Sequence, residues 1–165
     1  MSVLISSIYF SPVKSLSLSN IESCEIKKNL GILNDRNFAF SRAISLKEAQ
    51  LIEKKPNERK LNNFLTLKNS PVLNKYNFEY KANKLALIRD GRELISIIAN
   101  DPKQKFILVN KLVELEKSIT KPIFLLQNTE FPFYDTSSSN KIFNSISLIN
   151  LNRPPIPTFG EGSKK

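Results

Sequence analysis

Apolar and polar residues alternate over the first part of the chain in a way that predicts short β-strands. The run 3–10 is rich in β-branched and aromatic residues and ends before Pro12, which cannot donate to a strand ladder. Residues 20–28 alternate less regularly and predict a second strand. Phe38 and Phe40 are two residues apart, so we expect them to share one face of a further strand.

Residues 45–55 have the spacing of a short amphipathic helix. Ser45 can cap the first turn, and Glu48 follows three residues later, which together make the sequence signature of a capping box. Pro56 should end this helix. Residues 62–67 then return to strand-like character.

The strongest helical pattern covers about residues 102–118. Asp101 is placed to cap this helix, and Pro102 suits its first turn, where an amide hydrogen has no helical partner. Glu116 is the one charged residue on the apolar face that helical spacing predicts. The other members of that face are Phe106, Val109, Leu112 and Val113.

Residues 76–98 carry two hairpin signals. The pairs 82–83 (Ala-Asn) and 90–91 (Asp-Gly) interrupt apolar runs, and Asp-Gly suits a type I′ turn. We therefore expect a three-stranded meander before the long helix and a short strand at 123–127 after it. These elements predict a mainly β fold of the α+β class.

The end of the chain changes character. A polar stretch at 130–141 predicts a loop, and residues 142–151 predict one more strand. Residues 152–165 are rich in proline and glycine and poor in apolar side chains, so they predict a disordered tail. The length of 165 residues suits one domain with such a tail.

The formal net charge is +10, from 25 Lys and Arg against 15 Asp and Glu. This excess favours anionic partners, which could be nucleic acid, phosphorylated ligands or acidic lipid headgroups. The basic residues are mostly lysines spread along the chain, and they form neither a block nor an arginine-rich arm.

The sequence has no histidine and a single cysteine, Cys24, which excludes the usual zinc sites and any Ser-His or Cys-His catalytic pair. We interpret Cys24 as a small core residue, because it has no histidine partner and its neighbour Glu25 is acidic, which does not favour a reactive thiolate. A lone cysteine suits a reducing compartment, and no run approaches the roughly 18 apolar residues of a membrane span. The expected location is the cytoplasm.

Lys14 follows a Ser-Pro-Val turn and lies between two apolar runs. It could be an ordinary surface lysine at a strand end. It could instead be an ammonium that the turn at Pro12 fixes in place for a phosphate, which lysine binds as a point charge. Spacing alone favours the surface lysine.

Two further stretches contain charged residues that could have a structural or anion-binding role. Asp35 and Arg36 are interpreted as structural residues at a strand entry; because they are adjacent, we expect each to find a separate partner, with Arg36 binding carbonyls of the preceding turn. The basic segment 54–64 could be a solvated loop or a second edge of an anion pocket.

Four segments, in this order, match a known pattern. They are IYFSPVKSLSL (8–18), LGILNDRNFAF (30–40), NNFLTL (62–67) and ISLINL (146–151). The chain resembles the N-terminal β-barrel domain of MOSC (molybdenum cofactor sulfurase C-terminal) proteins, the family of the mitochondrial amidoxime-reducing component.

This resemblance implies a small β-barrel-like domain with a helical insertion over residues 1–151, with the first strand of the MOSC domain proper near 142–151. It also implies that the chain helps to bind the molybdenum cofactor (molybdopterin). Lys14 would contact the phosphate, and Arg59 or Lys60 would be a second anion contact. Residues in the pocket wall would be Ser145, Ser147 and Asn150.

Relatives of this kind continue into a MOSC core that holds the cysteine ligand of molybdenum. Here that region is replaced by residues 152–165, and Cys24 lies in the wrong half to substitute for the ligand. We therefore expect a cofactor-supporting domain in a truncated or split protein. This domain would not be catalytic alone; it would need a MOSC C-terminal domain, in cis or in trans, and could also use redox partners.

Two alternatives remain open. The first is a basic nucleic-acid or anion-binding module that uses Tyr76, Phe78 and Tyr80 for stacking. The second is a non-functional fragment with an open apolar face.

Overall fold

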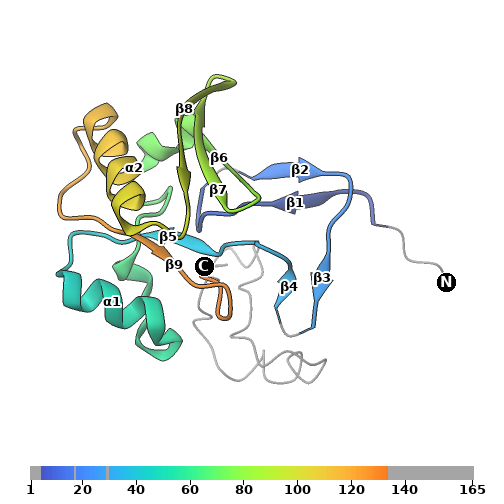
Figure 1. Ribbon diagram of the computed structural model, residues 1–165, viewed down its shortest axis with the longest axis horizontal. Coiled ribbons are helices and arrows are strands. Elements are labelled where there is room, and N and C mark those ends of the chain that lie inside the picture. The colour runs from blue at the N-terminus through green and yellow to red at the C-terminus, as the bar shows by residue number, and fades with distance from the viewer. Residues whose placement is uncertain (1–4, 17, 29, 134–165) are drawn as a thin grey trace, which may run out of the picture.

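The computed structural model describes residues 5–16, 18–28 and 30–133, which form small β-sheets and two α-helices (Figure 1). The α+β class predicted from the sequence is confirmed. The described strands make four separate antiparallel sheets, and within this part of the chain no sheet closes into a barrel. The strand expected at 142–151 and the tail expected at 152–165 lie outside the described residues.

The N-terminal region holds two small hairpin-like sheets. Strand β1 (Ile8–Phe10) pairs with β2 (Ser19–Ile21), and β3 (Ile26–Lys27) pairs with β4 (Gly31–Ile32). The single strand expected at 20–28 is therefore wrong, because its two ends pair in different sheets. Its middle is Glu22-Ser23-Cys24-Glu25, which has little of the β-branched character that supports a continuous strand.

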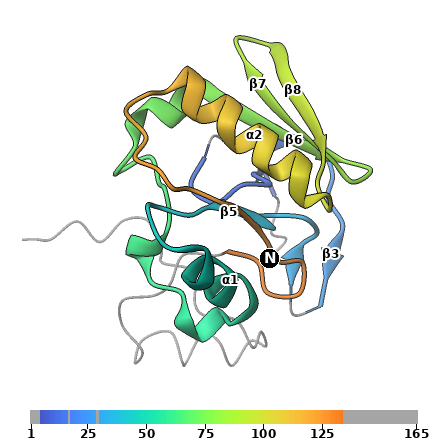
Figure 2. The same cartoon turned by 60° about the vertical axis from the view of Figure 1, so that its left-hand side comes forward.

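Strands β5 (Phe38–Phe40) and β9 (Leu125–Gln127) form the centre of the fold. Phe38, Phe40 and Leu125 face the larger hydrophobic core, as the spacing of the two phenylalanines predicts. Ala39 and Leu126 face a second core on the other side of these strands. The pair β5–β9 thus separates two cores, and Figure 2 shows β5 between helix α1 and the layer that contains α2.

Helix α1 (Leu46–Lys54) begins at the capping box that the sequence predicts. The Ser45 hydroxyl accepts from the Glu48 amide at 3.2 Å, and the Ser45 amide donates to the Glu48 carboxylate at 2.9 Å. Both hydrogen bonds satisfy amides at the helix start that have no partner within the helix. Ala49 and Ile52 are buried against the second core.

The segment that follows α1 is not a strand, so the strand expected at 62–67 is wrong. Short 3₁₀ turns occupy Pro56–Glu58, Leu61–Asn63 and Pro71–Lys75. Within the described residues, an isolated bridge between Ser41 and Phe64 is the only β pairing of this segment. Asparagine and proline supply the turns, while Phe64 still enters the core, so the apolar residues here reflect burial rather than a strand.

The predicted meander is confirmed. It consists of β6 (Tyr76–Lys81), β7 (Lys84–Arg89) and β8 (Arg92–Ile98), all antiparallel. The two residues of each connecting turn have positive φ, at 48° and 62° for 82–83 and at 52° and 74° for 90–91. Two consecutive positive values define the type I′ turn, whose twist matches that of the paired strands.

Helix α2 (Pro102–Leu115) packs along β8 (Figure 1). The Asp101 carboxylate accepts from the amides of Lys103 and Gln104 and caps its start, as expected. The helix ends at Leu115, earlier than predicted, and Glu116 is its C-terminal cap. Its buried residues are Leu108, Val109, Leu112 and Val113.

Phe106 is 65% exposed, so its assignment to the buried face of α2 is wrong. Leu108 takes that place, because the buried stripe is centred on Leu108 and Leu112, four residues apart. Phe106 instead lies on the side of α2 that borders the groove next to α1.

Candidate anion site

The Ser-Pro-Val-Lys turn is held against the start of β5 by the backbone. The Arg36 amide donates to the Ser11 carbonyl at 2.7 Å, and the Phe38 amide donates to the Pro12 carbonyl at 2.9 Å. The Lys14 amide in turn donates to the Phe38 carbonyl at 2.8 Å. Two of the motifs that carry the resemblance therefore interlock through three main-chain hydrogen bonds, which fix where the Lys14 side chain begins.

Asp35 and Arg36 complete this junction. The buried Asp35 carboxylate accepts from the Ser11 amide at 3.1 Å and also forms an ion pair with the Arg36 guanidinium. The expectation that these adjacent residues would not pair directly is wrong. Arg36 has a left-handed backbone (φ 53°), a conformation rare outside glycine, and in it the guanidinium reaches the preceding carboxylate.

Lys14 is not a surface lysine, because only 2% of it is exposed. Its neighbours Val13 and Leu16 belong to the larger core, and Val13 forms a bridge with Phe38. The Lys14 ammonium lies 5.5 Å from the centroid of the Phe64 ring, within the range of a cation–π contact. Burial of an ammonium is unfavourable unless nearby groups interact with its charge. Lys14 therefore does not serve only to keep the protein surface soluble, as an exposed lysine would.

Arg59 joins the end of α1 to the segment before Phe133. Its guanidinium donates to the carbonyls of Ile52 (2.8 Å) and Glu53 (3.1 Å). It also donates to the carbonyls of Phe131 (2.7 Å) and Pro132 (3.0 Å). Burial lowers the pKa of Arg59 to about 10, an effect that the negative charge of Glu53 partly offsets, so the side chain stays cationic at neutral pH.

A pair of aromatic rings connects the two cations. The centroids of Phe64 and Phe133 are 5.7 Å apart in an edge-on arrangement. The Arg59 guanidinium lies 4.0 Å from the Phe133 centroid, while the Lys14 ammonium contacts Phe64. Lys14 and Arg59 thus each contact one ring of the same aromatic pair, and we call these four residues the Lys14–Arg59 site.

Sequence reasoning missed the two aromatic members of the Lys14–Arg59 site. Phe64 lies inside the matching segment 62–67, so the resemblance offered a signal for it. No local spacing links Phe64 to Phe133, because the two residues come from distant parts of the chain. Lys60, the other candidate anion contact, is exposed, and its backbone amide donates to the Asn63 side chain at 2.6 Å.

The remaining candidate residues are not part of this site. Ser145, Ser147 and Asn150 lie outside the described residues. Cys24 is half-buried in the connection between β2 and β3. In the described part of the chain, no three side chains of His, Cys, Asp or Glu come together in a way that could hold a metal ion.

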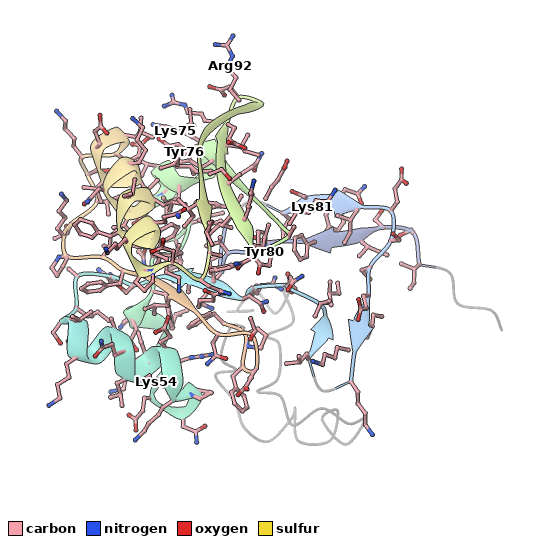
Figure 3. All side chains as sticks on the ribbon, viewed as in Figure 1. Lys54, Lys75, Tyr76, Tyr80, Lys81 and Arg92 are labelled. Atoms are coloured by element: carbon pink, nitrogen blue, oxygen red, sulfur yellow. The ribbon has the colours of Figure 1, made fainter. Side chains whose placement is uncertain are left out.

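Basic side chains lie at several separate places on the described part of the chain. Figure 3 shows Arg92 at the tip of the β7–β8 hairpin, Lys81 at the opposite end of the meander and Lys54 on α1. Tyr76 and Phe78 are buried in the core, and Tyr80 contacts Phe38 edge-on at 5.0 Å. Tyr76 and Phe78 are therefore not exposed for base stacking, whereas Tyr80 is half-buried.

Replacing Arg59 by lysine should lower the free energy of unfolding by about 1–2 kcal/mol, because a lysine keeps the charge but cannot serve four carbonyls at once. Chemical denaturation of the purified protein measures this loss. The matched control is Arg42→Lys on the exposed residue Arg42, which should change stability by less than about 0.5 kcal/mol. Equal losses of stability in the two variants would contradict the inference that the hydrogen bonds of Arg59 to four carbonyls stabilise the fold.

Comparison of the chain with models of protein families, with curated proteins and with solved structures finds no match. The resemblance to MOSC proteins therefore stays a prediction that rests on the four sequence segments. None of the helices in the described residues has the length and apolar character needed to cross a membrane.

Proposed function

We propose that this chain binds the phosphate end of a molybdenum cofactor (molybdopterin) through Lys14 and acts together with a MOSC C-terminal domain, in cis or in trans. The observation that carries the proposal is the placement of Lys14. The interlocked motifs fix its backbone, and it shares an aromatic pair with a second cation, Arg59. Two cations on one apolar platform favour a ligand that carries a multiply charged anionic group.

The residues of the Lys14–Arg59 site fit the anionic part of such a cofactor. Lysine binds phosphate as a point charge, and the buried surroundings strengthen that attraction because they screen charge less than water does. The Arg59 guanidinium already donates four hydrogen bonds to backbone carbonyls, so it would attract the cofactor mainly through its positive charge. The bound cofactor would supply redox chemistry, and the partner domain would supply the ligand for its metal. A reducing, cytoplasmic setting suits this role.

Access to Lys14 needs a local movement. Because only 2% of Lys14 is exposed, a phosphate can reach its ammonium only when the groups that cover it move aside. Docking of a partner domain can supply the free energy for that movement if the partner binds the open form better than the closed one. We therefore expect the full effect of Lys14 on cofactor binding only when the partner is present.

The experiment measures retention of molybdopterin. The chain is mixed with a MOSC C-terminal domain and molybdopterin and passed through a desalting column, and the pterin is then quantified by the fluorescence of its oxidised form. Lys14→Met should reduce retention at least tenfold, because methionine keeps the apolar stem and loses the charge. Lys14→Arg should recover part of the loss.

The control is Lys84→Met, a change at an exposed lysine of the β6–β7 hairpin that also removes one positive charge. It should leave retention unchanged. If Lys14→Met and Lys84→Met retain as much molybdopterin as the unaltered chain while all three remain folded, the proposed role of Lys14 is wrong.

A further inference from the structure

A groove of about 390 Å³ lies between α1 and the first half of α2. Residues 123–126, which lead into and include the start of β9, form its floor. Figure 2 shows the two helices on either side of this part of the chain. None of the four residues of the Lys14–Arg59 site lines the groove, so it is a separate feature.

The walls of the groove are mostly apolar, and part of that surface is open to solvent. Leu46 and Phe106 at the rim are both more than half exposed, while Ala49, Val109 and Leu125 are buried below them. An exposed phenylalanine beside an apolar hollow is the arrangement of a ligand cleft rather than of a packed helix interface. Its volume is at the lower end of the range of about 300–1,000 Å³ for small-molecule sites.

Two charged side chains also line the groove, Lys105 from α2 and Glu53 from α1. The Glu53 carboxylate already accepts from the Gln127 amide at 2.8 Å. The Lys105 ammonium forms no hydrogen bond and no ion pair within 4 Å among the described residues. Burial lowers the pKa of Lys105, which the more distant negative charge of Glu53 only partly opposes.

A partly buried ammonium that has no close partner among the described residues favours an incoming anion, because the anion restores the interactions that burial removed. The apolar walls favour a ligand whose remaining part is a hydrocarbon chain. A cationic headgroup suits the groove less, because the acidic side chain in it is already hydrogen-bonded, whereas the basic one is not.

We propose that the groove between α1 and α2 binds a monocarboxylate with an alkyl chain of medium length, with the carboxylate at the Lys105 ammonium and the chain along Phe106, Val109 and Leu125. The limited volume favours about ten carbons over the longer chains of membrane lipids. This site is independent of the cofactor role proposed above.

Isothermal titration of the whole chain with decanoate, below its micelle concentration, tests the proposal. Lys105→Met should raise the dissociation constant at least tenfold, because methionine keeps the stem that packs in the groove and removes the charge. Lys103→Met, at an exposed lysine on the same helix that does not line the groove, should leave it unchanged. Octanoate should bind more weakly than decanoate by about fourfold per methylene.

The second part of the test varies the headgroup of the ligand and locates where the ligand binds. Decanol and decylamine should bind at least tenfold more weakly than decanoate, and amide chemical shifts should change mainly at the residues that line the groove. Decylamine binding as tight as that of decanoate, an unchanged dissociation constant in Lys105→Met, or shift changes elsewhere would each overturn the proposal. Thermal melting of both variants verifies that they are folded. A number of decanoate molecules bound per chain that falls as the protein concentration rises would show that a second copy of the chain occupies the groove instead.

Discussion

Replacing Phe38 by alanine is expected to lower the free energy of unfolding by about 3–5 kcal/mol, the range for a fully buried phenylalanine. Phe38 is 0% exposed and lies on the face of β5 that meets the larger core. Its ring contacts Tyr80 edge-on at 5.0 Å, and its main chain holds Pro12 and Lys14. The cavity left by the ring would therefore open where β5, the meander and the Ser-Pro-Val-Lys turn meet.

Urea denaturation followed by circular dichroism measures this loss. The matched control is Phe106→Ala, the same substitution at a position on α2 that is mostly exposed, and it should change stability by less than about 0.5 kcal/mol. A comparable loss in both variants would mean that the groove side of α2 is packed more tightly than the structure shows. Alanine keeps the main-chain hydrogen bonds of Phe38 to Pro12 and Lys14. The cavity left by the ring would nevertheless loosen the packing around the Ser-Pro-Val-Lys turn, so Phe38→Ala should weaken molybdopterin retention even at temperatures where the variant is folded.

The elements that the sequence predicted correctly are those whose signals are local. The capping box at 45–48, the hairpin turn at 82–83 and the type I′ turn at 90–91 depend on a few adjacent residues and their own backbone preferences. The start of α2 at Asp101 is of the same kind. Tertiary packing did not have to be known for any of them.

The elements that were predicted wrongly depend on distant partners. The burial of Leu108 in place of Phe106 is decided by where β8 lies, which the helical period alone does not specify. The strand expected at 62–67 is replaced by 3₁₀ turns and one bridge, because the strand next to it, β5, pairs with β9 from far along the chain. Long-range pairing of this kind leaves no trace in a local pattern.

The candidate site shows the same division. The resemblance indicated Lys14 and either Arg59 or Lys60 as anion contacts, and in the structure Lys14 and Arg59 each contact one ring of the same aromatic pair. It could not indicate that Lys14 is buried, because a lysine beside a Ser-Pro-Val turn is exposed in most settings. The hydrogen bonds that occupy Arg59 connect it to Phe131 and Pro132, and these contacts exist only once the chain has folded.

The second prediction with a large effect on stability concerns a buried carboxylate at the end of α2. Glu116 is 7% exposed and accepts from the Tyr76 hydroxyl at 2.8 Å and from the Lys75 ammonium at 3.1 Å (Tyr76 and Lys75 are labelled in Figure 3). Burial raises the pKa of Glu116, but these two hydrogen bonds and the positive charges of Lys75 and Arg89 outweigh it, so the pKa lies below the ordinary value of 4.5. The charged form of Glu116 therefore stabilises the contact between α2 and the first strand of the meander.

Glu116→Gln should lower the free energy of unfolding by about 1.5–3 kcal/mol at neutral pH, since hydrogen bonds to a charged group are worth about that much. The sign of the pH dependence follows from the direction of the shift. Because the pKa is lower in the folded than in the unfolded protein, the stabilisation is present above about 4.5 and is lost as the pH falls through the folded value. The difference between the unaltered chain and Glu116→Gln should thus narrow below about pH 4.5.

Denaturation at neutral pH and at several acidic pH values measures both effects. Glu114→Gln is the matched control, because Glu114 lies on the same helix with 70% of its side chain exposed and pairs with Lys111 only at the surface. Its loss should be under about 0.5 kcal/mol at neutral pH. A stability difference for Glu116→Gln that stays constant down to acidic pH would mean that the carboxylate acts as a neutral acceptor, and the network would then depend on shape rather than on charge.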